Sequence, residues 1–270
     1  MSVIQGLILG LIQGLTEFLP ISSSGHLVLF QKLFGLKEGV LTFDAALHLA
    51  TLLAVVWIFR EDIINMIKKP FSKLTLLVVV GTIPTGIIGI AFKDQIEKIF
   101  ESGVTIGIEF ILTGIILWLA ESIRRKNKGI EKTSYLDATL MGTAQAIAIL
   151  PAISRSGLTL AAALMRGLNR EFALRLSFLI SIIPIFGAVV FDLKDALEPG
   201  NGITSGVEVL PLLVGMGAAA ISGYLAIKFM LKIFSKASLK IFSYYVFILG
   251  ALIIAEQLVR GSNSIFGGLF

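Results

Sequence analysis

The chain has 270 residues, of which 56% are hydrophobic and 15% charged, and its mean hydropathy is +0.91. This composition excludes a soluble domain and indicates a helical protein that crosses a membrane several times. The chain contains no cysteine, which excludes a disulfide framework, a thiolate nucleophile and a thiolate metal site. The net charge of +5 does not indicate a nucleic-acid partner, because the basic residues cluster in loops between apolar segments.

The first stretch of interest, residues 13–26, places a carboxylate, three hydroxyls and an imidazole within an apolar N-terminal segment. The groups belong to Glu17, Ser22, Ser23, Ser24 and His26. Such groups are costly to bury in hydrocarbon or protein unless they meet partners or water. We expect Pro20 and Gly25 to interrupt any helix that runs through them. A broken helix with ionisable groups at membrane depth predicts a functional site.

Six later segments are apolar and close to the roughly 20 residues that a transmembrane helix needs. They lie at residues 40–60, 74–92, 104–121, 172–192, 208–230 and 240–260. Lys and Arg concentrate in four connections, which hold Arg60, Lys68, Lys69 and Lys73; Arg124, Arg125, Lys126, Lys128 and Lys132; Arg166, Arg170 and Arg175; and Lys228, Lys232, Lys236 and Lys240. The connections at 94–101 and 192–208 are poorer in basic residues. The positive-inside bias therefore places the four basic connections in the cytoplasm.

This orientation predicts the topology of the two interrupted stretches. The chain before residue 40 begins and ends outside, whereas residues 133–165 begin and end inside. If both are re-entrant hairpins, they enter from opposite faces, which gives an inverted-topology repeat of about 1–121 and 133–260 in a single membrane domain. The alternative is that each stretch forms two short full spans. We therefore expect an all-α polytopic membrane protein with six full transmembrane helices and two re-entrant broken-helix hairpins whose tips face each other.

The second interrupted stretch repeats the first at one constant offset. The residues Gly10, Gln13, Ile21, Ser22, Ser24 and Gly25 reappear as Gly142, Gln145, Ile153, Ser154, Ser156 and Gly157. Pro151 lies near the place of Pro20, one residue out of register. Where the first copy has Glu17, Ser23 and His26, the second has Ile149, Arg155 and Leu158. We infer an acid/base half and an anion-holding half, with a binding site between them.

Arg155 is the strongest candidate for holding an anion. It lies in the sequence S-R-S-G, immediately before a predicted helix at 158–165. Backbone N–H groups at a helix start, the flanking hydroxyls of Ser154 and Ser156 and a guanidinium together make a phosphate cradle. The alternative is a structural pairing of Arg155 with Glu17 or with another acid such as Asp137.

Gln13 and Glu17 are four residues apart and therefore share one helix face. Together they can hold a hydrated divalent cation, a water, or a phosphate through that cation. The alternative is that Glu17 only pairs with Arg155. His26 follows a glycine in the hydroxyl-rich turn, where a proton-transfer group can be oriented, although a lone histidine is often structural.

The other polar residues have simpler interpretations. The three serines of the first turn fit a helix-capping role, and Ser23, at the offset of Arg155, is the hydroxyl we expect to reach the substrate. His48 lies in an apolar span, where we expect an interhelical hydrogen bond. Four acids lie near predicted span ends, where we expect them to be solvated or to snorkel: Asp44, Glu109, Asp137 and Glu256.

Two motifs carry a resemblance to a known family. They are the run E-F-L-P-I-S-S-S-G-H, preceded by Q-x-x-x-E at Gln13 and Glu17, and the run P-A-I-S-R-S-G-L-T. The chain resembles, over essentially its full length, the undecaprenyl-diphosphatase family of integral membrane proteins, also called bacitracin-resistance proteins. It has Ala152 and Ala50 where the family has glycine usually or often, and Gln13 where the family also uses Glu. Gln13 therefore removes one charged metal ligand.

The resemblance implies hydrolysis of the terminal phosphate of undecaprenyl (polyprenyl) diphosphate, which recycles a lipid carrier for cell-envelope synthesis. It also implies dependence on magnesium or calcium, with Glu17 as the metal residue, in the plasma membrane with a site open to the outer face. Glu17, Ser23, His26 and Arg155 match the family's functional residues, with Ser154, Ser156 and Thr159 in its phosphate motif. Further substrate-binding candidates are Gln13, Ser22, Ser24 and Gly157. Membrane lipids are further partners, and the sequence leaves a homo-oligomer open.

In the mechanism we expect, Arg155, the backbone of residues 154–157 and the cation neutralise charge on the phosphoryl oxygens. His26 acts on the proton of the attacking water or attacks phosphorus itself. Ser23 orients the water or serves as the nucleophile. The competing hypothesis is a transporter that flips a polyprenyl phosphate, because inverted repeats with broken helices are also a transporter architecture.

Overall fold

The computed structural model describes residues 1–36, 40–92, 95, 104–123, 127–150, 152–197, 208–234, 236–261 and 264–266. Regular secondary structure in these residues is helical, as predicted, with an isolated bridge between Lys128 and Leu168. The first half contains α1 (Val3–Glu17), α2 (Ser23–Leu33), α3 (Val40–Ile58), α4 (Arg60–Lys68), α5 (Lys73–Ala91) and α7 (Ile106–Ser122). The second half contains η1 (Ile130–Lys132), α8 (Tyr135–Ile147), α9 (Arg155–Met165), α10 (Arg170–Leu197), α11 (Val209–Ile233) and α12 (Lys240–Arg260).

Four helices of the described chain are long and apolar enough to cross a membrane: α5, α10, α11 and α12. The pair α3 and α4 passes the same test, but the chain bends by 73° between them, so it counts as a fifth span only if the bent pair is one. The basic connection predicted after residue 60 is therefore partly a charged helix. The 17 residues of α7 stand where a span was predicted, at the lower end of the about 17–25 residues that cross a bilayer.

Both predicted breaks occur, with shifted edges. The first lies between the end of α1 at Glu17 and the start of α2 at Ser23, and it contains Pro20. The prediction that Gly25 interrupts a helix was wrong, because Gly25 lies in the first turn of α2. The second break ends where α9 starts, at Arg155, three residues before the predicted start. Pro151 lies outside the described residues, as do Arg124, Arg125, Lys126 and most of the connections at 94–101 and 192–208.

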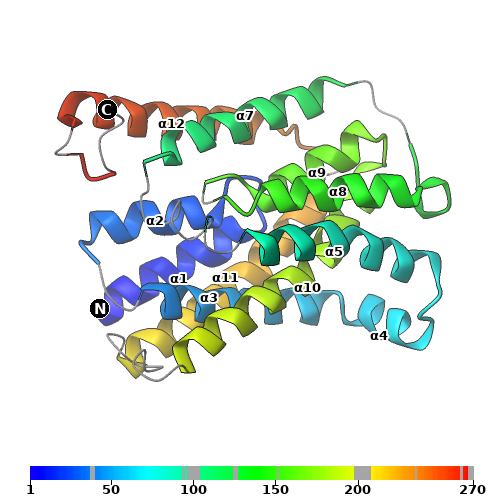
Figure 1. Ribbon diagram of the computed structural model, residues 1–270, viewed down its shortest axis with the longest axis horizontal. Helices are drawn as coiled ribbons and strands as arrows, with labels where there is room; N and C mark the ends of the chain where they lie inside the picture. The colour runs from blue at the N-terminus through cyan, green and yellow to red at the C-terminus, as the bar shows by residue number, and fades with distance from the viewer. Residues whose placement is uncertain are drawn as a thin grey trace.

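The two interrupted stretches fold into helical hairpins, α1–α2 and α8–α9, which approach each other from opposite ends of the molecule (Figure 1). In this view α1–α2 comes from the left and α8–α9 from the right. The outer helices of the hairpins pack in matching ways, α1 on α11 and α8 on α5. A side chain on Gly10 would collide with the carbonyl oxygen of Gly215, and one on Gly142 with that of Gly81. Backbones therefore touch at equivalent positions of the two copies.

The two hairpins also begin alike. Ser2 caps α1 and Ser134 caps α8, and each helix closes a capping box through the residue three positions later, Gln5 or Asp137. The remaining helices surround the hairpins: α7 packs along α12, and α3 packs against both α10 and α11. The hairpin tips are therefore enclosed by helices from both halves of the chain.

Candidate functional site

The hairpin tips meet at Glu17, the last residue of α1, and Arg155, the first residue of α9. Arg155 donates from Nη2 to Glu17 Oε1 in a direct ion pair. Glu17 is only 4% exposed, so the pair is stable only if close geometry and further hydrogen bonds offset desolvation. Gln13 Nε2, 3.0 Å away, and the Ser23 hydroxyl both donate to Oε2 of the same carboxylate. Four predicted site residues therefore meet at one carboxylate.

The ion pair bears on the two interpretations of Arg155. Arg155 does pair with Glu17, whereas Asp137 instead binds Lys128 and Arg166. A guanidinium has five N–H donors, so it can bind a carboxylate and a phosphate together. The contact with Glu17 is therefore compatible with both the structural and the phosphate-binding role.

The prediction that Asp137 is solvated was wrong, because this residue is fully buried at the start of α8. Burial acts to raise the pKa of Asp137, but hydrogen bonds from Ser134, Arg166 and Lys128 hold it to about 2. The carboxylate therefore stays charged and ties α8 to the C-terminal end of α9. Its role is in the base of the hairpin, remote in sequence from the tip.

Two further contacts join the tips. The Ser156 hydroxyl donates to the Leu19 carbonyl at 2.8 Å, across the two breaks. Gly25 lies against the other tip, where an added Cβ would stand 2.7 Å from the Phe110 ring and 3.0 Å from the Ala152 methyl. The small residue at Gly25 thus serves close packing between the hairpins and not, as predicted, a helix interruption.

The start of α9 has the form expected of an anion site. Ser154 caps the helix, and its hydroxyl accepts from the Gly157 N–H at 3.0 Å. The first N–H groups of a helix lack intrahelical acceptors and carry a partial positive charge. Thr159 points elsewhere, since its hydroxyl hydrogen-bonds with Ser177 of α10 at 2.6 Å. The guanidinium of Arg155 and the end of α9 thus combine two sources of positive charge at one place.

Helix α7 holds the second break in shape. Glu109 Oε2 accepts from the Ala152 N–H at 2.7 Å, and Thr113 Oγ1 accepts from the Ser154 N–H at 3.2 Å. Glu109 is buried, so the prediction that it is solvated at a span end was wrong. Sequence reasoning missed this pair, although an acid and a threonine four residues apart within an apolar span are a usable signal.

The first turn is held by Ser22. It is the one non-glycine residue of the described chain with a positive φ, 67°, and its hydroxyl accepts from the Gly25 N–H at 3.3 Å. Its hydroxyl also lies 3.4 Å from that of Ser24. A strained cap of this kind persists only where its surroundings hold it, and such positions cluster at functional sites. The capping role that the sequence left open thus belongs to Ser22, while Ser23 faces Glu17.

His26 is fixed at both ring nitrogens. Nδ1 lies 2.6 Å from the Ser22 carbonyl oxygen, which can only accept, so Nδ1 carries a hydrogen. Nε2 lies 2.7 Å from the hydroxyl of Tyr245 in α12, which donates to it when the imidazole is neutral. The two rings stack, and Phe110 packs edge-on against the imidazole. Tyr245 was missed because nothing in its apolar span singles it out.

His48 of α3 faces the same carboxylate from a third direction. Its Nε2 lies 3.8 Å from Glu17 Oε2, and its Nδ1 lies 2.8 Å from the Asp44 carbonyl oxygen. The Asp44 bond runs within α3, so the contact that joins helices is the one with Glu17. This places His48, which the sequence ranked below His26, beside the central carboxylate.

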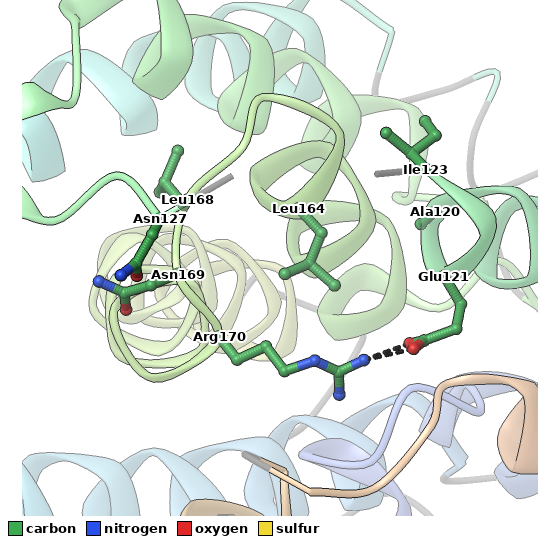
Figure 2. A pocket seen from close by; sticks show the side chains of 8 residues that line it. All are labelled: Ala120, Glu121, Ile123, Asn127, Leu164, Leu168, Asn169 and Arg170. Atoms are coloured by element: carbon green, nitrogen blue, oxygen red, sulfur yellow. Dashed lines mark hydrogen bonds and ion pairs between the residues drawn. The ribbon is translucent and has the colours of Figure 1, made fainter. Parts of the chain in front are cut away.

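The described residues line two cavities of different character. A small one of about 10 Å³ lies among Glu17, Arg155, Ser156 and Thr159, in addition to other residues, and has about the volume that one water occupies. A larger one of about 330 Å³ lies at the basic end of the molecule, between α7 and the start of α10 (Figure 2). There Arg170 points across to Glu121 and is already committed to it and to two backbone carbonyls. None of the predicted site residues lines that cavity, so the hairpin tips remain the candidate site.

A divalent cation fits the tip only with help from other ligands. No three side chains of the types His, Cys, Asp and Glu converge on a metal site within the described residues. Amide oxygens, water or substrate oxygens would have to complete the shell around Glu17. One such atom is present, because Gln13 Oε1 is fully buried and has no hydrogen-bond partner. The donor set thus fits a cation that the substrate helps to bind.

Known proteins resemble this chain over nearly its whole length. The model of the bacitracin resistance protein BacA family matches residues 6–252. The undecaprenyl-diphosphatase of Carboxydothermus hydrogenoformans is 57% identical over 95% of this chain and 98% of its own length. Undecaprenyl-diphosphatase 3 of Bacillus cereus is 46% identical (96% and 99% covered), and the Methanobrevibacter smithii undecaprenyl-diphosphatase is 41% identical (94% and 97%). The chain therefore belongs to the bacitracin resistance protein BacA family.

Proposed function

We propose that this protein is a membrane phosphatase that hydrolyses the terminal phosphate of undecaprenyl diphosphate. Water attacks the terminal phosphorus, the bond to the bridging oxygen breaks, and the products are inorganic phosphate and undecaprenyl monophosphate. The observation that carries the proposal is the meeting of Glu17 and Arg155 at the tips of two broken helices. The names of the relatives at 41–57% identity support the same substrate.

The architecture we propose is an inverted repeat of residues 1–121 and 133–260, with six full spans and two re-entrant hairpins. The matching capping boxes, the paired glycine contacts and the opposite approach of the hairpins support it. The loop charges support a site that opens to the outer face of the plasma membrane. The apolar tail of the substrate would lie in lipid, so polar residues need to recognise only the head group.

The orientation can be tested by labelling, because the chain has no cysteine of its own. A single cysteine at Lys69 is expected to react with a membrane-impermeant maleimide only in inverted vesicles. One at Ile265 is expected to react in intact spheroplasts. The reverse pattern would refute the proposed orientation, and reaction of both from one side would refute the proposed number of spans.

Arg155 and the start of α9 neutralise charge on the phosphoryl oxygens. Phosphoryl transfer relies mainly on positioning and on electrostatic stabilisation of the transferred group. Because Glu17 occupies one face of the guanidinium, the remaining N–H groups of Arg155 are the ones that bind phosphate. Glu17 in turn orients Arg155 and prevents an unpaired buried cation in the absence of substrate.

We further propose that magnesium or calcium binds at Glu17 Oε2, with Gln13 Oε1 as a second ligand. Arg155 uses the other carboxylate oxygen, so the two cationic groups do not compete. When bound, the cation neutralises negative charge on the diphosphate and helps orient it. The fully buried, unpaired oxygen of Gln13 is the observation that supports this part of the proposal.

His26 manages the proton of the attacking water. Ser22 holds a hydrogen on Nδ1, which leaves Nε2 as the basic nitrogen. Nε2 accepts from Tyr245, so the proton reaches it either through that hydroxyl or after the hydroxyl turns away. The Ser23 hydroxyl, held by Glu17, orients the water or attacks phosphorus itself. Both alternatives for Ser23 use the same position.

The deciding experiment is phosphate release by the protein in detergent, where there are no two sides to transport between. With undecaprenyl diphosphate and Mg²⁺, we expect one inorganic phosphate per lipid. Arg60→Ala serves as an active control, since Arg60 is an exposed arginine on α4. Lipid movement in proteoliposomes with no phosphate release in detergent would overturn the proposal in favour of a transporter.

A further inference from the structure

His48 and Glu17 present two electron-pair donors to each other. The Asp44 carbonyl, 2.8 Å from Nδ1, can only accept, so Nδ1 of the neutral ring carries the hydrogen. Nε2 then presents its lone pair toward Glu17 Oε2 at 3.8 Å. Two acceptors with no hydrogen between them repel each other. The arrangement is favourable only if a positive charge lies between them.

The same oxygen of Glu17 has a third donor beside it. The amide of Gln13 lies 3.0 Å from Oε2, and its oxygen is fully buried with no hydrogen-bond partner. A half turn of the amide exchanges its oxygen and nitrogen with little change in shape. The oxygen would then stand beside Oε2, as neighbouring ligands of one ion do. An unpaired buried oxygen that gains a ligand in this way relieves a cost of its own.

Access and helix origin also fit a ligand. The His48 side chain is 28% exposed and that of Glu17 is 2% exposed, so an ion arriving from outside meets the imidazole first. Glu17 and Gln13 come from α1, and His48 comes from α3. A bound ion would therefore tie the first hairpin to a neighbouring helix. Arg155 occupies Oε1 and leaves the Oε2 side to the ion.

We propose that His48 Nε2 is a direct ligand of the divalent cation at Glu17, with the Gln13 amide oxygen as third protein ligand. The inference rests on the proposed function, whose cation it completes. An imidazole ligand suits borderline metals, whereas all-oxygen shells suit magnesium and calcium. The site of this chain therefore selects Mn²⁺ or Zn²⁺ over Mg²⁺ and Ca²⁺. Water and the diphosphate oxygens fill the remaining positions.

The test uses the full-length protein with a tag free of histidine, stripped of metal and loaded with Mn²⁺ in detergent. The chain has only two histidines, so nitrogen coupling to bound Mn²⁺ in electron spin-echo modulation has only two imidazole sources. We expect this coupling in the unaltered protein and in His26→Gln, and its loss in His48→Gln. Mn²⁺ affinity of His48→Gln should fall by at least about tenfold, the lower end of what loss of an outer-shell partner costs.

Each outcome separates this inference from the proposed function. Coupling that is absent from the unaltered protein, or that survives in His48→Gln, overturns His48 as a ligand even if phosphate is released normally. An imidazolium paired with Glu17 would give that result. Coupling that depends on His48 in a protein that releases no phosphate would leave the ligand assignment standing and refute the phosphatase. An unchanged melting temperature of His48→Gln checks that the variant is folded.

Discussion

The two hairpins share a skeleton and differ in their polar groups. Both begin with a serine capping box, cross a neighbouring helix at a glycine, and place a fully buried glutamine at equivalent positions, Gln13 and Gln145. At the tips the first carries Glu17 and the second Arg155. The comparison teaches that duplicated geometry brings the tips together, whereas the unmatched residues at the tips supply opposite charges. Changes to the unmatched residues should therefore affect chemistry, and changes to the shared skeleton should affect stability.

Loss of the cationic tip should have the largest effect. We expect Arg155→Ala to lower kcat/KM for phosphate release by about 10³-fold or more, as loss of a charge-stabilising arginine does in other phosphoryl transfers. Glu17 is then left buried and unpaired, so the melting temperature should also fall. Phosphate release and thermal unfolding in detergent measure both effects. Near-normal turnover would remove Arg155 from the site.

The two buried glutamines provide a matched pair. Gln13→Ala removes the amide beside Glu17, and we expect kcat/KM to fall by about ten- to a hundredfold, as for loss of a supporting group. Gln145 donates instead to Thr85 of α5, remote from the tip. Gln145→Ala should change kcat/KM by less than about threefold while costing about 1–3 kcal/mol of stability, as its partner does. Equal kinetic effects would contradict the division between skeleton and site.

Tyr245 tests how the first hairpin is completed from outside the repeat. Tyr245→Phe keeps the ring that stacks on His26 but removes the hydroxyl at Nε2. We expect kcat to fall by about tenfold, a part of what general base catalysis contributes, with KM unchanged. Tyr244→Phe is the matched control, since Tyr244 packs on Trp118 instead. A rise in KM alone, or equal effects of both variants, would show that Tyr245 does not position His26.

The smallest effect concerns the contact between the tips. Gly25→Ala would press a methyl against Phe110 and Ala152, and we expect a loss of about 1–3 kcal/mol of stability. Ala152→Gly in the same chain removes one of the two clashes and should restore part of the melting temperature. If the second substitution restores nothing, the tips do not pack as described.

Much of the site could be predicted because its signals are local. Polar residues inside an apolar segment mark themselves, and the repeat of Gln13 and Ser22 at Gln145 and Ser154 pairs the two breaks. Loop charge predicted the opposite entry of the hairpins, and the tips do meet at Glu17 and Arg155. The edges were less accurate: α9 starts at Arg155 because Ser154 caps it, and Gly25 belongs to a helix.

By itself, the sequence determined the helical class, the apolar segments, the two breaks and the polar residues at their tips, because hydropathy, capping and spacing act between near neighbours. Only the tertiary structure decided which other residues surround the tips. Tyr245 meets His26 across 219 positions, and Glu109 meets Ala152 across 43. His48 reaches Glu17 from another helix. Such contacts depend on how helices pack, and no local pattern encodes which face of one helix meets which residue of another.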